Sequence, residues 1–285
     1  MQAWSYALSS AHYAPATAPI LLRGDVCRNL KTAAALGYQG LELHTREDVQ
    51  LDYDTIIGTS ADCGVSVAAV VTGWLNTQGG VSLVDDRPYI SHAAIEGMRN
   101  YIKMAARLKT NVIIGWIKGL IPEGTDPQPY LERLAGNLTM ICTEAREQGV
   151  KIFVEVINRY ETNIFTTVRE AMDFLGSWEI PNCYIHLDTF HMNIGESNPV
   201  EAIRSCGERL GYFHVADNTR LYPGSGIIDF RSYFSALKEI GYKGFVSVEC
   251  LPYPDGETAA RRALEYLKQC EPEINIEKLE IGEVS

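Results

Sequence analysis

The chain has 285 residues, of which 46% are apolar, and this content supports a large core and excludes an intrinsically disordered protein. Its formal net charge of -11 argues against nucleic acid as the main partner, because an acidic surface repels a phosphate backbone. No apolar run approaches the roughly 18–20 residues that cross a bilayer, and the first residues do not resemble a signal peptide. We therefore expect a cytoplasmic protein with no membrane partner.

Short β-branched runs alternate along the chain with longer amphipathic segments. The predicted strands are residues 4–9, 40–44, 65–71, 111–116, 152–157, 184–188, 212–216 and 245–249. The predicted helices are residues 25–36, 54–63, 89–108, 128–148, 166–176, 199–206, 229–240 and 257–269. Several of these helices stop at a glycine, as at Gly37, Gly64, Gly149 and Gly241, which is typical of a helix C-terminus.

Eight strand–helix pairs at a spacing of roughly 30 residues predict an α/β fold of the (β/α)8 TIM-barrel type. The main rival is a doubly wound open sheet, which would usually carry a glycine-rich phosphate turn after its first strand, and none is present. We expect one barrel domain over residues 1–270, followed by a polar tail at 271–285. The seven cysteines are odd in number, widely spaced and without a C-x-x-C pair, so we expect free thiols.

Four consecutive predicted strands carry a polar residue at or near the C-terminal end: Glu155, Asp188, His214 and Glu249. Their separations of 33, 26 and 35 residues correspond to one strand–helix unit each. In a barrel this spacing places the four side chains around the C-terminal rim, where such barrels hold their active sites.

Three carboxylates and one imidazole that converge would repel one another unless a positive charge lay between them. A set of oxygen ligands with one histidine favours Mn²⁺ or Mg²⁺, and leaves Co²⁺ and Zn²⁺ open. The sequence therefore predicts one divalent metal, with Mn²⁺ as the first choice, bound by Glu155, Asp188, His214 and Glu249.

Long stretches around these residues resemble the sugar isomerase and epimerase family that shares the xylose-isomerase-like barrel, in particular the ketose 3-epimerases. The stretches are VEVINRYET (154–162), HLDTFHMNI (186–194), YFHVADNTRLYPGSG (212–226) and LKEIGYKGFVSVEC (237–250), with weaker matches at 24–43 and 70–83. The motifs NRYET and SVECLP, with a TG after the third strand, look most similar to the branch that epimerises keto-hexonates such as 5-keto-L-gluconate.

The resemblance implies roles for individual residues. It makes Glu155, Asp188, His214 and Glu249 the metal ligands, and Glu155 and Glu249 also the two acid/base carboxylates. It implies that Glu161, His191 and Arg220 hold substrate oxygens.

These residue types also suit proton transfer beside a carbonyl. One carboxylate removes the proton next to a ketone, and a second on the opposite face returns a proton with inverted configuration. His191, in the loop expected to leave the strand after Asp188, is suited to hydrogen-bond a substrate oxygen and localise enediolate charge. Arg220 lies in a turn-rich loop on the same rim, where Glu161 would contact it or a substrate hydroxyl.

Other residues near the predicted strand ends complete the expected pocket. Lys118 follows the fourth strand, and we expect it to reach a substrate carboxylate as a point charge. Trp116, Trp74 and Tyr6 also lie near strand ends, and we expect them to wall the pocket and exclude water.

The expected function is that of a metal-dependent epimerase of a keto-sugar or keto-sugar acid, of the 5-keto-L-gluconate or D-tagaturonate type. The alternatives are an aldose–ketose isomerase, an inosose-type dehydratase, a metal-dependent endonuclease and a non-catalytic sugar-binding barrel. The endonuclease family on this barrel uses a histidine-rich cluster, whereas this acidic chain has only six histidines. We expect an unphosphorylated substrate, because no phosphate-binding loop is evident, and a homo-oligomer, because related barrels commonly pair.

Overall fold

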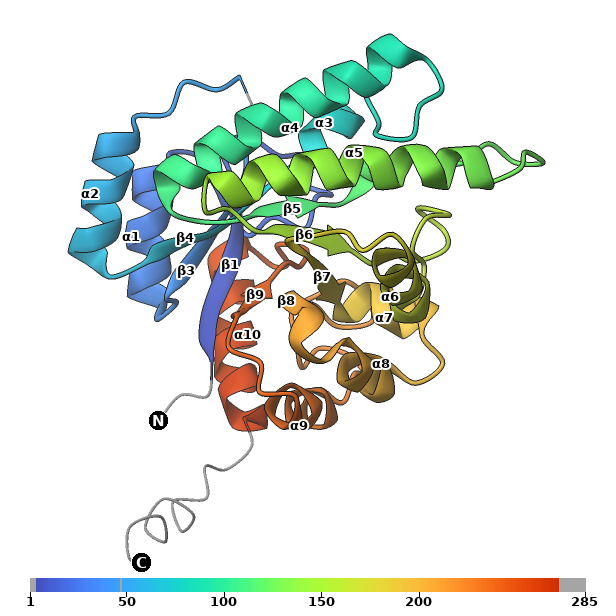
Figure 1. The fold of residues 1–285 in the computed structure, drawn as a ribbon. Coiled ribbons are helices and arrows are strands. Elements are labelled where there is room, and N and C mark those ends of the chain that lie inside the picture. Colours follow the sequence, from blue (N-terminus) through green and yellow to red (C-terminus); the bar gives the residue numbers. More distant parts are fainter. Residues whose placement is uncertain (1–3, 47, 272–285) are drawn as a thin grey trace, which may run out of the picture.

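A closed parallel barrel forms the centre of the protein, as Figure 1 shows for the computed structural model, which describes residues 4–46 and 48–271. Its eight strands are β1 (Ser5–Ala11), β3 (Gly40–His44), β4 (Ser66–Val71), β5 (Val112–Ile114), β6 (Ile152–Glu155), β7 (Cys183–Asp188), β8 (Leu210–Val215) and β9 (Phe245–Val248). Each strand pairs with the next, and β9 pairs back with β1. The predicted TIM barrel is confirmed.

Helices cover the outside of the barrel (Figure 1). The longer ones are α1 (Val26–Leu36), α2 (Tyr53–Cys63), α4 (Pro88–Leu108), α5 (Gln128–Glu147), α6 (Val168–Ser177), α8 (Pro199–Cys206), α9 (Phe230–Glu239) and α10 (Gly256–Cys270). All eight correspond to predicted helices, with bounds that agree to within two residues. The glycines expected to stop four of the helices have positive φ angles, at Gly37, Gly64, Gly149 and Gly241, because the left-handed conformation costs glycine little.

Short elements in the connections were not expected from the sequence. They are β2 (Leu22–Arg23), α3 (Gly73–Thr77), η1 (Trp116–Lys118), α7 (Thr189–Gly195) and η2 (Gly207–Arg209). The expected loop after Asp188 is therefore the helix α7. Asp188 itself caps this helix, because its Oδ1 accepts the backbone N–H of Phe190 at 2.8 Å.

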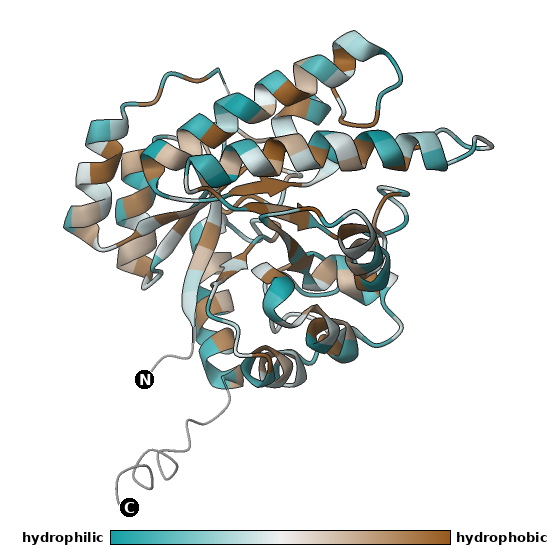
Figure 2. Cartoon of the chain, in the orientation of Figure 1, coloured by the Kyte–Doolittle hydropathy of each residue, from teal (hydrophilic) through white to brown (hydrophobic). Residues whose placement is uncertain are grey.

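Side chains alternate between the two faces of each strand. In β6, Ile152 and Val154 pack in the large cluster shared with the helices, whereas Phe153 packs in a separate small cluster inside the barrel. Glu155 follows Phe153 by two residues and therefore also points inward. Figure 2 shows the resulting contrast between apolar strands in the centre and polar outer helix faces. The inward face of the strands thus changes from apolar side chains at its base to polar ones at its C-terminal end.

Several other expectations concern the whole chain. All seven cysteines carry free thiols, as expected. None of the described helices combines the length and the apolarity needed to cross a membrane. The division into a domain at 1–270 and a tail at 271–285 stays a prediction, because residues 272–285 lie outside the described residues.

Close packing of the barrel base leads to a stability prediction at Gly40. A Cβ added there would lie 2.7 Å from Phe245 Cε1 and 2.8 Å from the Cβ of Ala7, so we expect Gly40→Ala to destabilise the fold by about 1–3 kcal/mol. Gly58, in α2, has no neighbour within 4 Å of such a Cβ. Gly58→Ala should therefore stabilise by up to about 1 kcal/mol, through helix propensity. Urea unfolding of both variants measures the difference; equal stability of Gly40→Ala and the natural protein would contradict the packing.

Candidate active site

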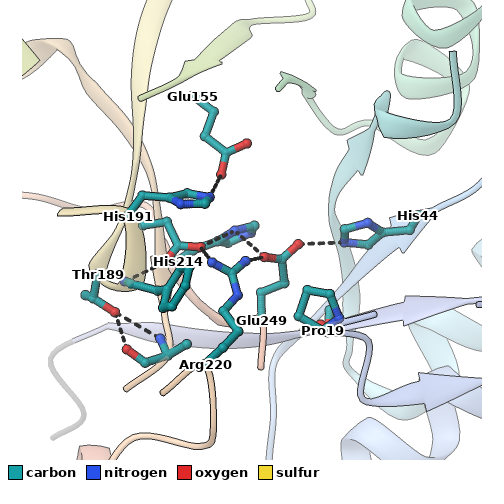
Figure 3. A network of polar contacts seen from close by, with 12 residues as sticks. Pro19, His44, Glu155, Thr189, His191, His214, Arg220 and Glu249 are labelled. Atoms are coloured by element: carbon teal, nitrogen blue, oxygen red, sulfur yellow. Dashed lines mark hydrogen bonds and ion pairs between the residues drawn. The ribbon is translucent and has the colours of Figure 1, made fainter. Parts of the chain in front are cut away.

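The four residues predicted from strand ends meet at the C-terminal mouth of the barrel, and Figure 3 labels three of them, Glu155, His214 and Glu249. Glu155, Asp188 and His214 belong to β6, β7 and β8, and Glu249 follows β9 directly. His214 Nδ1 lies 3.8 Å from Asp188 Oδ2 and 3.6 Å from Glu249 Oε2. Asp188 and His214 are completely buried, whereas Glu155 and Glu249 line a cavity that opens at this mouth.

Ligand atoms of these residues lie close enough together to bind a cation. Atoms of Asp188, His214 and Glu249 lie within 4.8 Å of one another, and atoms of Glu155, Asp188 and His191 form a second such group. Glu155 also forms a group of this kind with His186 and His214, so it adjoins the first group through both Asp188 and His214.

Two buried atoms of the cluster have no hydrogen-bond partner within the part of the chain that the structure describes: Asp188 Oδ2 and His214 Nδ1. Arg220 Nη1 lies 2.9 Å from Asp188 Oδ2, but the geometry of this ion pair is not that of a hydrogen bond. Buried polar atoms almost always have partners, and three carboxylates with one imidazole nitrogen are suitable ligands for Mn²⁺ or Mg²⁺. The donor set therefore fits a divalent metal ion.

The pKa shifts of the carboxylates in the cluster also favour a bound cation. Burial, together with the negative charge of Glu249, raises the pKa of Glu155 to about 8. Burial also raises the pKa of Glu249, against the opposing effect of Arg220, which contacts its carboxylate. A bound cation would favour the ionised form of both carboxylates.

A fourth carboxylate, that of the buried Glu42 on β3, was missed from the sequence. His214 Nε2 and His44 Nε2 each lie 2.6 Å from one of its oxygens, and His44 Nε2 is also 3.6 Å from Glu249 Oε1. Despite complete burial, the charges of the two histidines and their hydrogen bonds hold the pKa of Glu42 well below its usual value. An ionised Glu42 keeps a proton on Nε2 of His214 and thereby leaves Nδ1 facing Asp188 and Glu249.

Asn158 fixes the orientation of His191, which lies in α7. The Asn158 side chain accepts the backbone N–H of Tyr160 at 2.9 Å and donates to Glu161 Oε1 at 2.8 Å, which identifies its oxygen and nitrogen. Its NH2 group lies 2.8 Å from His191 Nδ1, so Nδ1 is the acceptor and the ring proton resides on Nε2. Burial lowers the pKa of His191 to about 3. His191 is therefore a neutral donor, with Nε2 3.6 Å from Glu155 Oε1.

Two of the expected wall residues line the cavity, and one does not. Trp116 is 43% exposed and donates from Nε1 to Glu161 Oε2 at 3.2 Å, and Trp74 lies on the same cavity. The expectation for Tyr6 is wrong, because it lies near the N-terminal end of β1, completely buried, and donates to Glu271 at 2.8 Å.

Lys118 was expected to reach a substrate in the cavity, but it does not line the cavity. Its side chain is completely buried, and Nζ donates to the carbonyl oxygens of Gly115 at 3.0 Å and Glu155 at 2.8 Å. The structure thus corrects the expected contact with a substrate carboxylate. Lys118 instead links Gly115, just after β5, to Glu155 of β6, for which an acid/base role is predicted.

Arg220 is held by a loop organised around one buried carboxylate. Asp217 accepts four backbone N–H groups at 2.9–3.2 Å, from Asn218, Gly224, Gly226 and Ile228. A Cβ at Gly226 would lie 2.4 Å from Asp217 Oδ1, so the loop requires glycine there. Arg220 itself has a φ of 61°, an uncommon value that places its guanidinium group against Asp188 and Glu249.

The cavity at this mouth has a volume of about 530 Å³. Its lining includes five residues with a predicted catalytic or substrate-binding role besides Trp116: Glu155, Glu161, His191, Arg220 and Glu249. A hollow of this size, with several convergent polar groups, is typical of a small-molecule site.

Comparison with known proteins identifies the family. Residues 30–270 match the family described as the xylose isomerase-like TIM barrel. The chain belongs to this family. It is 38% identical over 143 residues to L-ribulose 3-epimerase of Methylomonas sp. strain DH-1, a match that spans 44% of this chain and half of that relative. It is 30% identical over 215 residues to ketose 3-epimerase of Arthrobacter globiformis, which covers 75% of this chain and 73% of the relative.

Solved structures of this family have the same fold. The crystal structure of D-allulose 3-epimerase from Methylomonas sp. in complex with D-allulose superposes with a TM-score of 0.79 at 24% sequence identity. The match covers 94% of this chain and 98% of that one. At this identity the likeness supports the xylose isomerase-like barrel and leaves the reaction to be argued from the site.

The contact between Glu42 and His214 predicts an effect on metal affinity. In Glu42→Gln, the amide can accept from only one of the two imidazoles, so we expect the affinity for Mn²⁺ to fall by about 10–100-fold. Calorimetric titration with Mn²⁺ measures this loss. Glu196→Gln serves as the control, because Glu196 is a partly buried carboxylate that binds the backbone N–H of Val168 outside the site. Unchanged affinity in a folded Glu42→Gln protein would rule out the orienting role.

Proposed function

We propose that the protein is a metal-dependent epimerase that inverts a carbon beside the ketone of a keto-sugar. The observation that carries this proposal is the pair of carboxylates that reach one cavity from different sides (Figure 3). Glu155 extends from β6, and Glu249 extends from the end of β9. Removal of a proton from one face and its return to the other requires two such groups.

Glu155 and Glu249 take the acid/base roles. The carboxylate that faces the substrate hydrogen removes it as a base, and the other carboxylate, in its protonated form, returns a proton to the opposite face of the enediolate. General acid–base catalysis of this kind contributes about 10²–10⁴-fold to the rate. An aldose–ketose isomerase shares the enediolate but needs one such carboxylate, so the second favours epimerisation.

The residues that would hold the metal are Glu155, Asp188, His214 and Glu249. When bound, a divalent ion supplies Lewis-acid polarisation of the ketone oxygen. His191 would donate its Nε2 proton to a substrate oxygen as negative charge develops there. Arg220 would provide a further donor on the same side of the cavity, and Glu161 an acceptor for a hydroxyl group.

The relatives support the same reaction class. The two curated relatives described above are epimerases, which are isomerases, and the chain shares their family. We therefore assign it to the isomerase class and take a keto-sugar as its substrate. Mn²⁺ as the cellular ion, a homo-oligomeric assembly and the keto-hexonate branch stay predictions.

Exchange of substrate hydrogen in deuterated water tests the two-carboxylate mechanism. In Glu155→Gln and Glu249→Gln we expect inversion to fall by at least about 100-fold, because each variant lacks one acid/base. Each variant should still exchange deuterium into one epimer, from the face served by the remaining carboxylate, as NMR would show. Bound metal is measured in parallel, and Glu196→Gln is the control. Full inversion by either variant would exclude the mechanism.

A further inference from the structure

The lining of the active-site cavity is divided by charge. The consecutive strands β6 to β9 and their connections contribute Glu155, Glu161, His191, Arg220 and Glu249. The strands β1 to β5 and their connections contribute uncharged residues, except His44, which is engaged by Glu42. The reacting carbons of a substrate belong beside the charged half of the lining, from β6 to β9, because the acid/base groups lie there. The rest of the substrate would then face the uncharged half, from β1 to β5.

The loop between β1 and β2, held by hydrogen bonds from Arg23, forms one wall of this uncharged half. Six residues of the connection between β1 and β2, all within residues 14–20, line the cavity, and Figure 3 shows Pro19 beside Glu249 and His44. The Arg23 guanidinium donates to four backbone carbonyls of this connection: those of Ala14 at 3.0 Å, Pro15 at 2.9 Å, Ala18 at 3.5 Å and Ile20 at 2.6 Å. The wall is therefore preformed, which lowers the entropic cost of binding against it.

Two tryptophans supply the other walls. Trp74, in α3, and Trp116, in η1, both line the cavity, and both are partly exposed to solvent. Indole rings offer large apolar faces at a low cost in conformational entropy, and such faces suit flat ligand rings. Thr77 and Gln78 lie at the same wall and can hydrogen-bond hydroxyl groups.

The charges at the cavity disfavour an anionic group in the uncharged half. Arg220 is the one lysine or arginine among the described residues of the lining, and it is engaged by Asp188 and Glu249. Lys118 does not line the cavity, and its Nζ is engaged by the carbonyl oxygens of Gly115 and Glu155. A carboxylate or phosphate placed against Trp74 and Pro19 would lose hydration without gaining a cationic partner. At about 530 Å³, the cavity is also in the range that holds drug-sized ligands.

Building on the proposed function, we infer that this uncharged half is a subsite for a neutral ring remote from the ketone. The substrate class is then a neutral keto-sugar that carries a second sugar ring or an aromatic group away from the ketone, in place of the keto-hexonate that the sequence resemblance implies. The subsite is defined by residues 14–20, Trp74, Gln78 and Trp116. Arg23 positions residues 14–20 and does not touch the substrate itself.

Three ligands with the same reacting ketone test the inference: a free neutral ketohexose, its glycoside in which a glucosyl ring is attached through the hydroxyl on the carbon farthest from the ketone, and the keto-hexonate with a carboxylate at that same carbon. The ketone stays free in all three. Each is followed by deuterium exchange and by calorimetric binding to the Mn²⁺-loaded protein. We expect kcat/KM for this glycoside to exceed that for the free sugar by about tenfold or more, and that for the keto-hexonate to be lowest. A keto-hexonate used as well as the glycoside would overturn the inference.

Substitutions in and near the subsite test whether it causes the preference for the glycoside over the free sugar. Trp74→Ala should reduce the ratio of kcat/KM between glycoside and free sugar by about tenfold, whereas Trp178→Ala, at an exposed tryptophan outside the cavity, should leave the ratio unchanged. Gln78→Arg adds a cation at the exposed rim and should raise the use of the keto-hexonate relative to the free sugar. Arg23→Met should loosen residues 14–20, seen as faster hydrogen exchange there, and lower the same glycoside ratio. If these ratios of kcat/KM are unchanged in Trp74→Ala, Gln78→Arg and Arg23→Met, the subsite inference is refuted.

The two proposals fail in different ways. If no ligand exchanges deuterium, the epimerase proposal fails, while the order of calorimetric affinities still decides the subsite. If the free sugar exchanges and inverts but the glycoside neither binds nor reacts better, the epimerase proposal stands and the subsite inference fails.

Discussion

Repulsion among buried carboxylates is the constraint on which the rest of this site depends. Glu42, Glu155, Asp188 and Glu249 converge within the mouth of the barrel, where little water is available to screen their charges. Histidines engage Glu42, and Arg220 contacts Asp188 and Glu249. The remaining excess of negative charge is what a divalent cation would neutralise.

The same constraint explains how the connections are built. Arg220 must approach the carboxylates from a loop, and that loop is fixed by the four backbone hydrogen bonds to Asp217. Asp188 serves both the cluster and the start of α7, and this helix places His191 beside Glu155. On the opposite half of the rim, Glu42 is buried and engaged by two histidines, and apolar walls and tryptophans line the cavity. The barrel thereby separates the half of the rim that we propose for chemistry from the half that we propose for recognition.

Much of this arrangement could be predicted from the sequence. The spacing of Glu155, Asp188, His214 and Glu249 by one strand–helix unit each was sufficient to place them on one rim, because parallel strands of a barrel share their direction. Glu42 escaped notice because it lies inside a short strand rather than at a strand end, although the alternation in GLELH puts it on the inward face with His44. Lys118 could not be placed, since a rim position does not tell whether a long side chain turns to solvent or to backbone carbonyls. The helix α7 was missed because its seven residues are too few for a clear periodicity.

In the proposed site, one cation is shared by the residues at the ends of β6 to β9. A crystal structure of the Mn²⁺-loaded protein, with anomalous diffraction collected to locate manganese, tests it most directly. We expect a single strong peak within ligand distance of Glu155, Asp188, His214 and Glu249. A peak held instead by Glu42, His44 and Glu249, or no peak at this mouth in protein saturated with Mn²⁺, would contradict it.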